Sequence, residues 1–490
     1  MQPQVQLTPA LQIGFSGHRV LSDEKLCRTA ILKVLAEWKT KMPGGISGLS
    51  SLAAGGDLLF AEACFELGIP LRVLLPLPMT GFREDFDATT WGLVERALER
   101  VSSFEIVDGG TERPGCYYEC GLETLHQCGL IIVLWNGRPA RGPGGTGEMA
   151  NQGKNLGIPT IWIHSETGEI TQWNTDGSCP LDPELRLLNN LPDGEVKVGV
   201  TPKEQALAWF EKLDENANQV APQFRKITAI PILCAGAGAL LTTAAYSFKR
   251  EASVLFGLSA LLGLAATFVP GWLKGREKQE GWAKTRAAAE ISRSFVALWN
   301  VPARYSVMDK SGVPELEGML NALNHLKMLE GFRQLKDNSF QFKMEYLKER
   351  VHGQAAYFSR QTERAVRAMS RALAVIRYAV FFAIGGNLFM VVSQLLHLLP
   401  AGAWMIWLGL AIVLAFQIAA GAGALIVIND YARRQRRYLE MRRLILNYAT
   451  QLEQAQTWAS ILRIVTLVEK TLLTEVLEWR ALFRNQKFGK

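Results

Sequence analysis

Four long segments without a charged residue limit what this chain can fold into. Each has at least 22 residues, and they form two pairs because only a short turn separates the members of each pair. A helix needs about 20 apolar residues to cross the hydrocarbon core of a bilayer. We therefore predict four transmembrane helices in two hairpins, with buried core helices of a large soluble protein as the alternative. The segments are Ile227–Phe248, Ala252–Leu273, Tyr378–Pro400 and Ala401–Ile428, with turns at 249–251 and near Leu399–Ala403.

Basic residues beside these segments indicate how the hairpins are oriented. They flank the ends that lead into the rest of the chain, whereas the turns hold only Lys249, Arg250 and Glu251. Cytoplasmic flanks of membrane helices carry the excess of basic residues, so the N-terminus, the middle segment and the C-terminus are expected in the cytoplasm. Clustered arginine can also bind nucleic acid, but lipid explains these positions and no nucleic-acid partner is expected. The main flanking residues are Lys274, Arg276, Lys278, Arg360, Arg364, Arg367, Arg371, Arg377, Arg433, Arg434, Arg436, Arg437, Arg442 and Arg443.

Charge divides the chain into two parts of different character. Met1–Arg225 contains 19 basic and 28 acidic residues, a balance of −9, and Lys226–Lys490 contains 34 and 18, a balance of +16. An acidic half joined to a basic and apolar half indicates that only the second part meets an anionic surface. Residues 1–10 lack the basic start and apolar run of a secretory signal, so the 7 cysteines are expected to be reduced.

Residues 11–163 alternate short apolar runs with amphipathic stretches, which is the pattern of an α/β domain. Strands rich in Val, Ile and Leu with helices between them are typical of a parallel sheet covered on both faces. We therefore predict a Rossmann-like sheet, in which ligands bind beyond the carboxyl ends of the strands. The expected strands are Leu11–Phe15, Gly45–Leu49, Leu71–Leu75, Leu130–Trp135 and Pro159–Ile163, and the expected helices are Glu24–Trp38, Asp57–Leu67, Trp91–Arg100 and Thr146–Leu156.

Glycine-rich turns follow three of the expected strands, at Gly14–Arg19, Ser50–Asp57 and Asn136–Glu148. Glycine lets backbone N–H groups close around a phosphate, and the helices that open after the second and third turns add a favourable dipole. Nearby arginines supply charge for phosphates, so we predict a nucleotide pocket here, with plain tight turns as the alternative. The expected ligand-binding residues are Gly14, Ser16, Gly17, His18, Arg19, Ala54, Gly55, Gly56, Asp57, Arg83, Trp135, Arg138, Gly144, Gly145, Thr146, Gly147 and Glu148, with Arg141 as a further source of charge.

These motifs resemble the SLOG superfamily, which is related to DprA and to the LOG-type phosphoribohydrolases. The resemblance covers about the first third of the chain and lies in Gly14–Arg19, Ala53–Asp57 with Glu62, Trp135–Arg138 and Gly144–Glu148. It implies a domain that binds nucleotide-derived signalling ligands. By position, Gly144–Gly147 would hold a phosphate, Glu148 would lie near the ribose, and Gly55–Asp57 would close the opposite side.

The second half resembles the SLATT families, two-transmembrane effector domains that associate with SLOG domains in bacterial conflict systems. The likeness lies in the hairpin architecture and in Trp282, Arg286, Ala289 and Glu290. It implies permeabilisation of the membrane in antiviral abortive infection. We therefore expect an effector of the bacterial inner membrane that senses a nucleotide-derived second messenger, either an NAD-derived one such as a cyclic ADP-ribose or a cyclic oligonucleotide. It would respond by oligomerising or opening a pore, and the repeated hairpin unit favours a homo-oligomer.

Two other functions fit parts of the sequence. A membrane-anchored LOG-like hydrolase would cleave the N-glycosidic bond of a nucleotide, with Asp57 and Glu62 as further carboxylates. However, Pro143–Glu148 departs from the family motif Pro-Gly-Gly-x-Gly-Thr-x-x-Glu because the glutamate directly follows the last glycine, and acid–base catalysis depends on geometry first. A transporter would carry ionisable residues at mid-membrane depth, which these segments lack. We expect no catalytic residue and no cofactor.

The organisation expected from the sequence has four regions. A nucleotide-binding domain occupies 1–165, a connecting segment 166–222, and two hairpin units with cytoplasmic helices 223–350 and 351–490. Ser165–Val200, rich in Pro, Gly, Asn and Asp, is expected to be irregular. The cluster Cys116, Cys120, His126 and Cys128 fits no common zinc spacing, so no metal site is expected and buried thiols are the better interpretation.

Overall fold

The computed structural model describes residues 4–140, 142–177, 182–247, 252–273, 276–301, 313–330, 339–396, 398 and 402–485. The chain forms two compact units. Unit 1 comprises Met1–Glu215 and Ala288–Phe340, and unit 2 comprises Asn216–Ala287 and Gln341–Lys490. The boundaries of these units differ from those of the four expected regions. Residues 166–215 and 288–340 belong to the same unit as the α/β domain.

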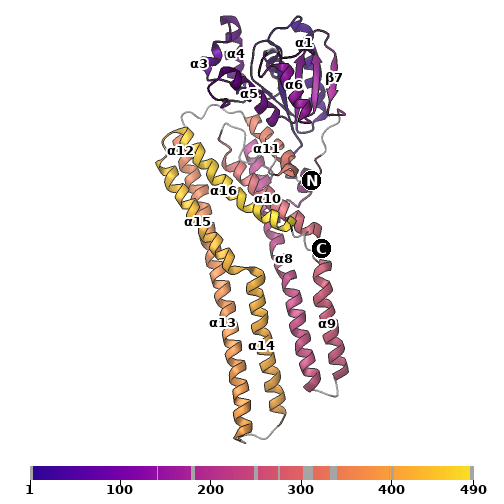
Figure 1. Ribbon diagram of the computed structural model, residues 1–490, viewed down its shortest axis with the longest axis vertical. Coiled ribbons are helices and arrows are strands. Elements are labelled where there is room, and N and C mark those ends of the chain that lie inside the picture. The colour runs from indigo at the N-terminus through magenta and orange to yellow at the C-terminus, as the bar shows by residue number, and fades with distance from the viewer. Residues whose placement is uncertain are drawn as a thin grey trace. The chain divides into compact units, whose positions relative to one another are not determined.

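Unit 1 is built on one sheet, which in the described part of the chain has seven strands (Figure 1). Their order is β4-β3-β2-β1-β5-β6-β7, and every neighbouring pair is parallel except β6 and β7. The strands are β1 (Leu11–Gly17), β2 (Ile46–Ser50), β3 (Leu71–Leu75), β4 (Ser103–Ile106), β5 (Leu130–Trp135), β6 (Thr160–His164) and β7 (Ile170–Trp173). The predicted α/β domain with a mostly parallel sheet is confirmed.

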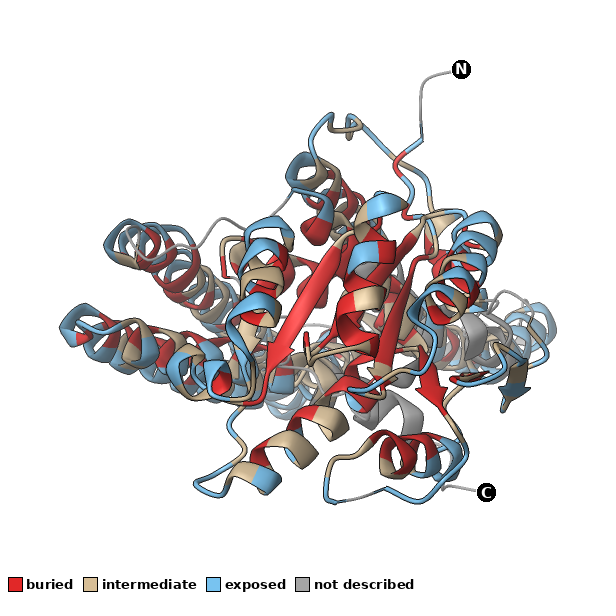
Figure 2. Cartoon of the chain, turned by 90° about the horizontal axis from the view of Figure 1, so that it is seen from above, coloured by how far each residue is buried: buried red, intermediate tan, exposed pale blue. Residues whose placement is uncertain are grey.

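Helices cover both faces of this sheet, and the outer surfaces of these helices are exposed (Figure 2). Alternate residues of β5 show the two faces: Leu130, Ile132 and Leu134 pack with α1, α2 and α4, whereas Ile131 and Val133 pack with α5 and α6. The sequence of a strand that is buried on both faces is a nearly continuous run of apolar residues, and β5 has such a sequence. The helices of this unit are α1 (Glu24–Lys41), α2 (Gly56–Glu66), α3 (Met79–Arg83), α4 (Ala88–Arg100), α5 (Arg113–Gln127), α6 (Thr146–Asn155), α7 (Pro183–Asn189) and α11 (Glu317–Glu330), with the short 3-10 helix η2 (Pro314–Leu316).

The expected set did not include strands β4 and β7 or helices α5 and α7 of unit 1. Strand β4 has only four residues and two of them are polar, and α5 contains Pro114, Gly115 and Gly121, so neither shows a strong period. Strand β7 and helix α7 lie within Ser165–Val200, which is therefore not irregular throughout. Strand β7 pairs antiparallel with β6 and forms the edge of the sheet, and its length of only four residues limits pairing with another chain.

A buried lysine explains why the segment beyond β7 belongs to unit 1. Helix α8 (Pro202–Ser247) begins in this unit and carries Lys212, whose side chain is 1% exposed. Its ammonium group donates to the carbonyls of Val5 and Asn189, at 2.8 and 2.9 Å, and pairs with Asp193 at 2.8 Å. A buried ammonium group is tolerated only when hydrogen bonds and a counter-charge satisfy it, so Lys212 fixes the N-terminal segment, α7 and the start of α8 together.

Unit 2 is helical. Helix α14 runs antiparallel to α13 (Figure 1), with Ala383, Ile412 and Ala415 buried between them. Helix α15 continues along α13, where the rings of Phe358 and Tyr438 lie 6.1 Å apart. The elements assigned wholly or partly to unit 2 are α8, α9 (Ala252–Leu273), α10 (Arg276–Ala297), α12 (Ser339–Glu345), the π-helix η3 (Tyr346–His352), α13 (Gly353–Leu395), α14 (Ala403–Asn429), α15 (Tyr431–Gln454) and α16 (Trp458–Asn485).

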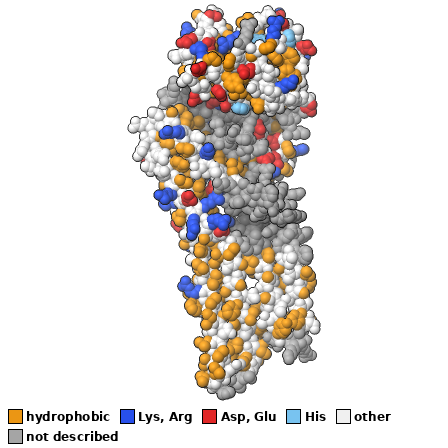
Figure 3. Space-filling model, viewed as in Figure 1, with side chains coloured by type: hydrophobic (Ala, Val, Ile, Leu, Met, Phe, Trp, Pro, Cys, Tyr) orange, Lys and Arg blue, Asp and Glu red, His pale blue; other side chains and the backbone are white. Residues whose placement is uncertain are grey.

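Two helical stretches of the described chain are long and apolar enough to cross a membrane. They lie within Ser339–Leu395 and Ala403–Gln454, and only 6% and 12% of their apolar windows are buried. A core helix of a soluble protein would instead be mostly buried, and Figure 3 shows the hydrophobic side chains at the surface of α13 and α14. The apolar segments of the first hairpin that the structure describes are shorter, Ile230–Tyr246 and Ser253–Thr267. The turn at 249–251, Lys274 and residues 399–401 lie outside the described residues.

Candidate functional site

The strand order of the sheet reverses between β1 and β5. From β1 the chain proceeds outward through β2, β3 and β4, and it then returns to place β5 on the other side of β1. In a doubly wound sheet, the crevice beyond the carboxyl ends of the strands at such a reversal is the usual ligand site. Here the backbone N–H of His18 donates to the carbonyl of Leu134 at 3.1 Å, which joins the ends of both strands. Two of the predicted glycine turns therefore meet at this point.

His18 connects the two turns through its side chain. Its Nε2 lies 3.0 Å from Oδ1 of Asn136 and 3.2 Å from the backbone N of Asn136. An unprotonated Nε2 accepts from the backbone N–H, whereas a protonated one donates to the amide oxygen. His18 is half-buried, at the point where the ends of β1 and β5 meet.

Gly17, Gly55 and Gly56 allow the end of β1 to lie directly against the start of α2. A Cβ on Gly17 or on Gly56 would be 3.0 Å from the Cα of the other residue. Gly55 has φ +77°, and a Cβ there would be 2.4 Å from the carbonyl oxygen of Arg19. These glycines therefore have a packing role that requires no ligand.

Asp57 is the buried polar centre of this arrangement, with 3% of its surface exposed. Its carboxylate accepts from the hydroxyls of Ser50 and Ser51 at 3.0 and 2.9 Å, and from the backbone N–H groups of Ser51 and Gly17 at 3.3 Å. Burial raises the pKa of Asp57 to about 6, and the hydrogen bonds from Ser51, Ser50 and Gly17 oppose that shift. Asp57 thus ties the ends of β1 and β2 to the start of α2.

The loop after β5 is held by its own side chains. Glu148, in the first turn of α6, accepts from the backbone N–H of Gly144 at 2.8 Å, and Trp135 Nε1 donates to the carbonyl of Arg138 at 2.7 Å. Gly144 has φ +76°, and a Cβ there would lie 2.8 Å from the backbone of Tyr117. Glu148 therefore holds the loop closed through its carboxylate. The resemblance to SLOG proteins would instead place this carboxylate near a ribose.

Helices α2 and α6 both begin at this edge after a glycine. Their N-caps are Gly55 and Gly145, and no side chain among the described residues caps either helix. Thr146 is buried at the first position of α6, and a Cβ on Gly147 would be 3.1 Å from Trp135 Nε1. The first N–H of α2, on Gly56, donates to the carbonyl of His18 at 2.9 Å, and the positive ends of the α2 and α6 dipoles favour an anion at this edge.

Arg19 is two residues past the end of β1, and its side chain belongs to a cluster that the sequence did not reveal. Its guanidinium lies over the ring of Tyr117 at 5.0 Å and 3.9 Å from the carboxylate of Asp85. Asp85 also accepts from Arg113 at 2.5 Å, at the start of α5. The side chain of Arg19 is 48% exposed, so it has capacity for an anionic ligand. The missed residues lie around α3 and α5, where no glycine motif marks the chain.

The other expected arginines that the structure describes, Arg83 and Arg138, contact other side chains. Arg83 ends α3 and its guanidinium lies 5.4 Å from the centre of the Trp91 ring. Arg138 is 76% exposed and 3.9 Å from the carboxylate of Glu166. Arg141 lies outside the described residues. His18 and Arg19 directly follow β1, one of the two strands at the reversal of strand order.

Three further residues of the expected set lie beneath or beside the turns. Gly14 is in the middle of β1, and a Cβ there would be 2.9 Å from the Cβ of Cys128 in the layer above the sheet. Ser16 is half-buried and pairs in register with Val133 of β5, and Ala54 is half-buried in the turn before α2. Gly14 thus permits close helix packing, three residues before the strand end.

The thiols of the Cys116 cluster have separate partners. Those of Cys116, Cys120 and Cys128 are buried and donate to the carbonyls of Gly110, Leu74 and Leu125. His126 is exposed. Within the residues that the structure describes, no group of three or more His, Cys, Asp or Glu side chains is placed to hold a metal ion.

Comparison of the chain with protein-family models, with curated proteins and with solved structures finds no match. The class of the protein therefore follows from its own features. It joins a doubly wound α/β domain, with glycine turns gathered at the reversal of strand order, to a helical unit that contains two helices long enough to cross a membrane.

Proposed function

We propose that this protein is a membrane effector that binds a nucleotide-derived messenger at the crevice between β1 and β5. The observation that carries the proposal is the convergence of the turns after β1, β2 and β5 at one edge of the sheet, with the N-termini of α2 and α6 directed there. Phosphate binding at such an edge needs backbone N–H groups, a helix dipole and a cation. Arg19 supplies the cation, and His18 supplies a hydrogen-bonding group for the rest of the ligand.

The response to the ligand, in this proposal, takes place in the bacterial inner membrane. The likeness to SLOG and SLATT proteins supports a sensor joined to a pore-forming effector in antiviral defence, and four helices in two hairpins would span the bilayer with both termini in the cytoplasm. A homo-oligomer would open once the ligand binds one assembly state more tightly. A shift from about 1:99 to 99:1 requires roughly 5.5 kcal/mol of differential affinity, which several sites in an oligomer can supply together.

Thermal unfolding of the full chain in detergent tests the sensor. The panel contains ADP-ribose, cyclic ADP-ribose isomers, NAD, AMP and cyclic di- and trinucleotides, and each ligand is recovered afterwards and analysed by chromatography. A ligand at 100 times its Kd stabilises the folded state by about 2.7 kcal/mol, which raises Tm by several degrees. Arg19→Ala should abolish the shift, whereas Arg186→Ala, an exposed arginine of α7, should retain it.

The chemical state of the recovered ligand decides between a sensor and the LOG-like hydrolase. Intact ligand agrees with a sensor, and with the structural use of Glu148 as the residue that closes the loop after β5. Free base together with ribose phosphate would identify a hydrolase and overturn the gating proposal. Ligand-dependent leakage of a dye from vesicles that contain the full chain tests the pore, and leakage that is independent of ligand would contradict it.

A further inference from the structure

Arg371 and Arg377 lie on α13 beside the apolar surface of the α13–α14 hairpin. Contacts between the helices set their register: the rings of Phe389 and Trp404 are 6.0 Å apart, and Gly386 lies against Ile412. The same register continues into α15, where Phe358 meets Tyr438. These pairs show which residues of the two helices lie opposite each other. On this register Arg371 lies about level with Leu425, and Arg377 lies about level with Ala419. Both arginines therefore lie beside the last apolar turns of α14.

The helix geometry directs both arginines away from the packed face. Ala365 and Ala383 are buried on the face of α13 that meets its partner helices. Arg371 is six residues after Ala365 and Arg377 is six residues before Ala383, and at 100° per residue each lies about 120° around the helix from that face. Both arginines are exposed. They flank the hairpin on two sides, outside the contact between its helices.

Carboxylates of the same helices do not neutralise these arginines. The sequence contains no acidic residue between Glu363 and Asp430. Glu363 pairs with Arg367 at 3.7 Å and Asp430 with Arg433 at 3.0 Å. Within the described part of the chain, no carboxylate lies within 4.0 Å of Arg371 or Arg377. Arg371 and Arg377 therefore lie next to exposed apolar side chains without a carboxylate beside them. The counter-charge for their guanidinium groups must come from the surroundings of the helices.

The apolar length of the hairpin places the arginines at the depth of lipid headgroups. Trp404 and Trp407 lie near the turn of the hairpin, and tryptophan is enriched at membrane interfaces. About 20 residues, or roughly 30 Å, separate one interface from the other, which sets the second boundary near Leu425 and Arg371. Arg377 is six residues, about 9 Å, inside that level, and a long arginine side chain can extend back to the headgroups. Figure 3 shows basic side chains gathered where the apolar surface of α13 and α14 ends.

We propose that Arg371 and Arg377 bind the phosphates of anionic phospholipids in the cytoplasmic leaflet. The inference rests on the membrane insertion included in the proposed function, but not on the messenger. Arginine presents a fork of N–H donors that matches a phosphate, and each basic residue near an anionic surface adds about 1 kcal/mol, or a factor of about five. The pair should therefore favour an anionic headgroup over a zwitterionic one by roughly 30-fold.

Retained lipid measures this preference directly. The full chain is reconstituted in an equimolar mixture of phosphatidylglycerol and phosphatidylcholine and exchanged into detergent, and the lipid that remains bound is quantified by mass spectrometry. The wild type should retain phosphatidylglycerol in excess. Arg371→Gln/Arg377→Gln should reduce the ratio of bound phosphatidylglycerol to phosphatidylcholine by up to roughly 30-fold, and Arg371→Lys/Arg377→Lys should keep much of it because lysine retains the charge.

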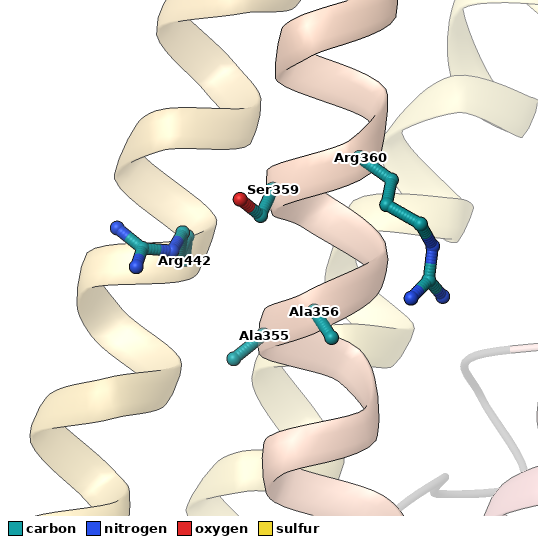
Figure 4. Close-up of a pocket in the computed structure, with 5 residues that line it drawn as sticks. All are labelled: Ala355, Ala356, Ser359, Arg360 and Arg442. Carbon is teal, nitrogen blue, oxygen red and sulfur yellow. The ribbon is translucent and has the colours of Figure 1, made fainter.

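A matched pair controls for net charge. Arg360 and Arg463 are exposed arginines away from the apolar segments, on α13 and α16. Arg360 lines a shallow depression with Ala355, Ser359 and Arg442, and its side chain extends to the side of α13 away from α15 (Figure 4). Arg360→Gln/Arg463→Gln should leave the lipid ratio unchanged. An equal loss in both pairs, or an unchanged ratio in Arg371→Gln/Arg377→Gln, overturns the proposal. Extraction of the chain from membranes by alkaline carbonate would refute insertion itself, and with it the proposed membrane effector.

Discussion

Substitution of Gly55 by alanine tests whether the glycine turn before α2 is required by packing. Gly55 has φ +77° and ψ −115°, a region that is essentially restricted to glycine, and alanine there costs about 1–3 kcal/mol in strain. The new Cβ would also lie 2.4 Å from the carbonyl oxygen of Arg19, a backbone atom that cannot move independently. We therefore expect Gly55→Ala to destabilise the protein by at least about 3 kcal/mol, since a contact this short adds to the strain.

Gly68 is a matched control at the other end of the same helix. It also has positive φ, +64°, but a Cβ there would meet nothing within 4 Å. Alanine at this position should cost only about 1 kcal/mol, the strain of a left-handed conformation. The two variants should differ by about 2 kcal/mol, which corresponds to roughly 4–8 °C in Tm for a unit of this size.

Thermal unfolding of the full chain in detergent, followed by tryptophan fluorescence, measures both variants. Equal losses in Tm for Gly55→Ala and Gly68→Ala would refute the packing argument. Gly145 gives a third comparison, since its φ is −69° and a Cβ would lie 3.0 Å from the Ala140 side chain and 3.1 Å from the Gly142 carbonyl. Gly145→Ala should therefore lose less stability than Gly55→Ala, because alanine adopts this φ and the neighbours need to shift by only a few tenths of an ångström.

Two further predictions concern buried carboxylates. Because burial raises the pKa of Asp57 to about 6, the folded state binds its proton more tightly than the unfolded state, and stability should fall by about 3 kcal/mol as pH rises from about 4 to 6. Asp57→Asn should remove this dependence, and a pH profile of Tm that matches the wild type would contradict it. Glu469 is fully buried and pairs with Arg350 at 2.7 Å, so Glu469→Gln should cost about 3–5 kcal/mol by leaving the cation unpaired. Glu363→Gln, which breaks the exposed pair with Arg367, should change stability by less than about 1 kcal/mol. Equal changes in Tm for Glu469→Gln and Glu363→Gln would refute this difference between the buried and the exposed ion pair.

Most of the α/β domain could be predicted because its strands are short, apolar and separated by clear turns. Leu71–Leu75 and Leu130–Trp135 were predicted with the bounds that the structure gives. Strand β4 was missed because its stability comes from the neighbouring strand β3 and not from its own composition. Lys212 shows the same limit, since nothing in the sequence near it indicates that it will be buried against Val5, 207 positions away.

The candidate site was only partly accessible to sequence reasoning. Glycine turns after strands are a local signal, and they identified the loops at the ends of β1, β2 and β5. Their individual roles depend on distances between segments: the contact of Gly17 with Gly56 and the stacking of Arg19 on Tyr117 appear only after folding. Asp85 and Arg113 have no motif around them, so their place beside Arg19 could not be read from the chain.

Features that depend on near neighbours along the chain could be predicted from the residues alone. Apolar length gave the long helices, and the spacing of apolar runs gave the parallel sheet, because both reflect the local periods of helix and strand. The tertiary structure decided the strand order that brings the ends of β1 and β5 together, the burial of Asp57, and the level of Arg371 and Arg377 beside α14. Those features depend on which distant segments pack against each other, and packing selects partners by shape and by the need to satisfy buried polar groups.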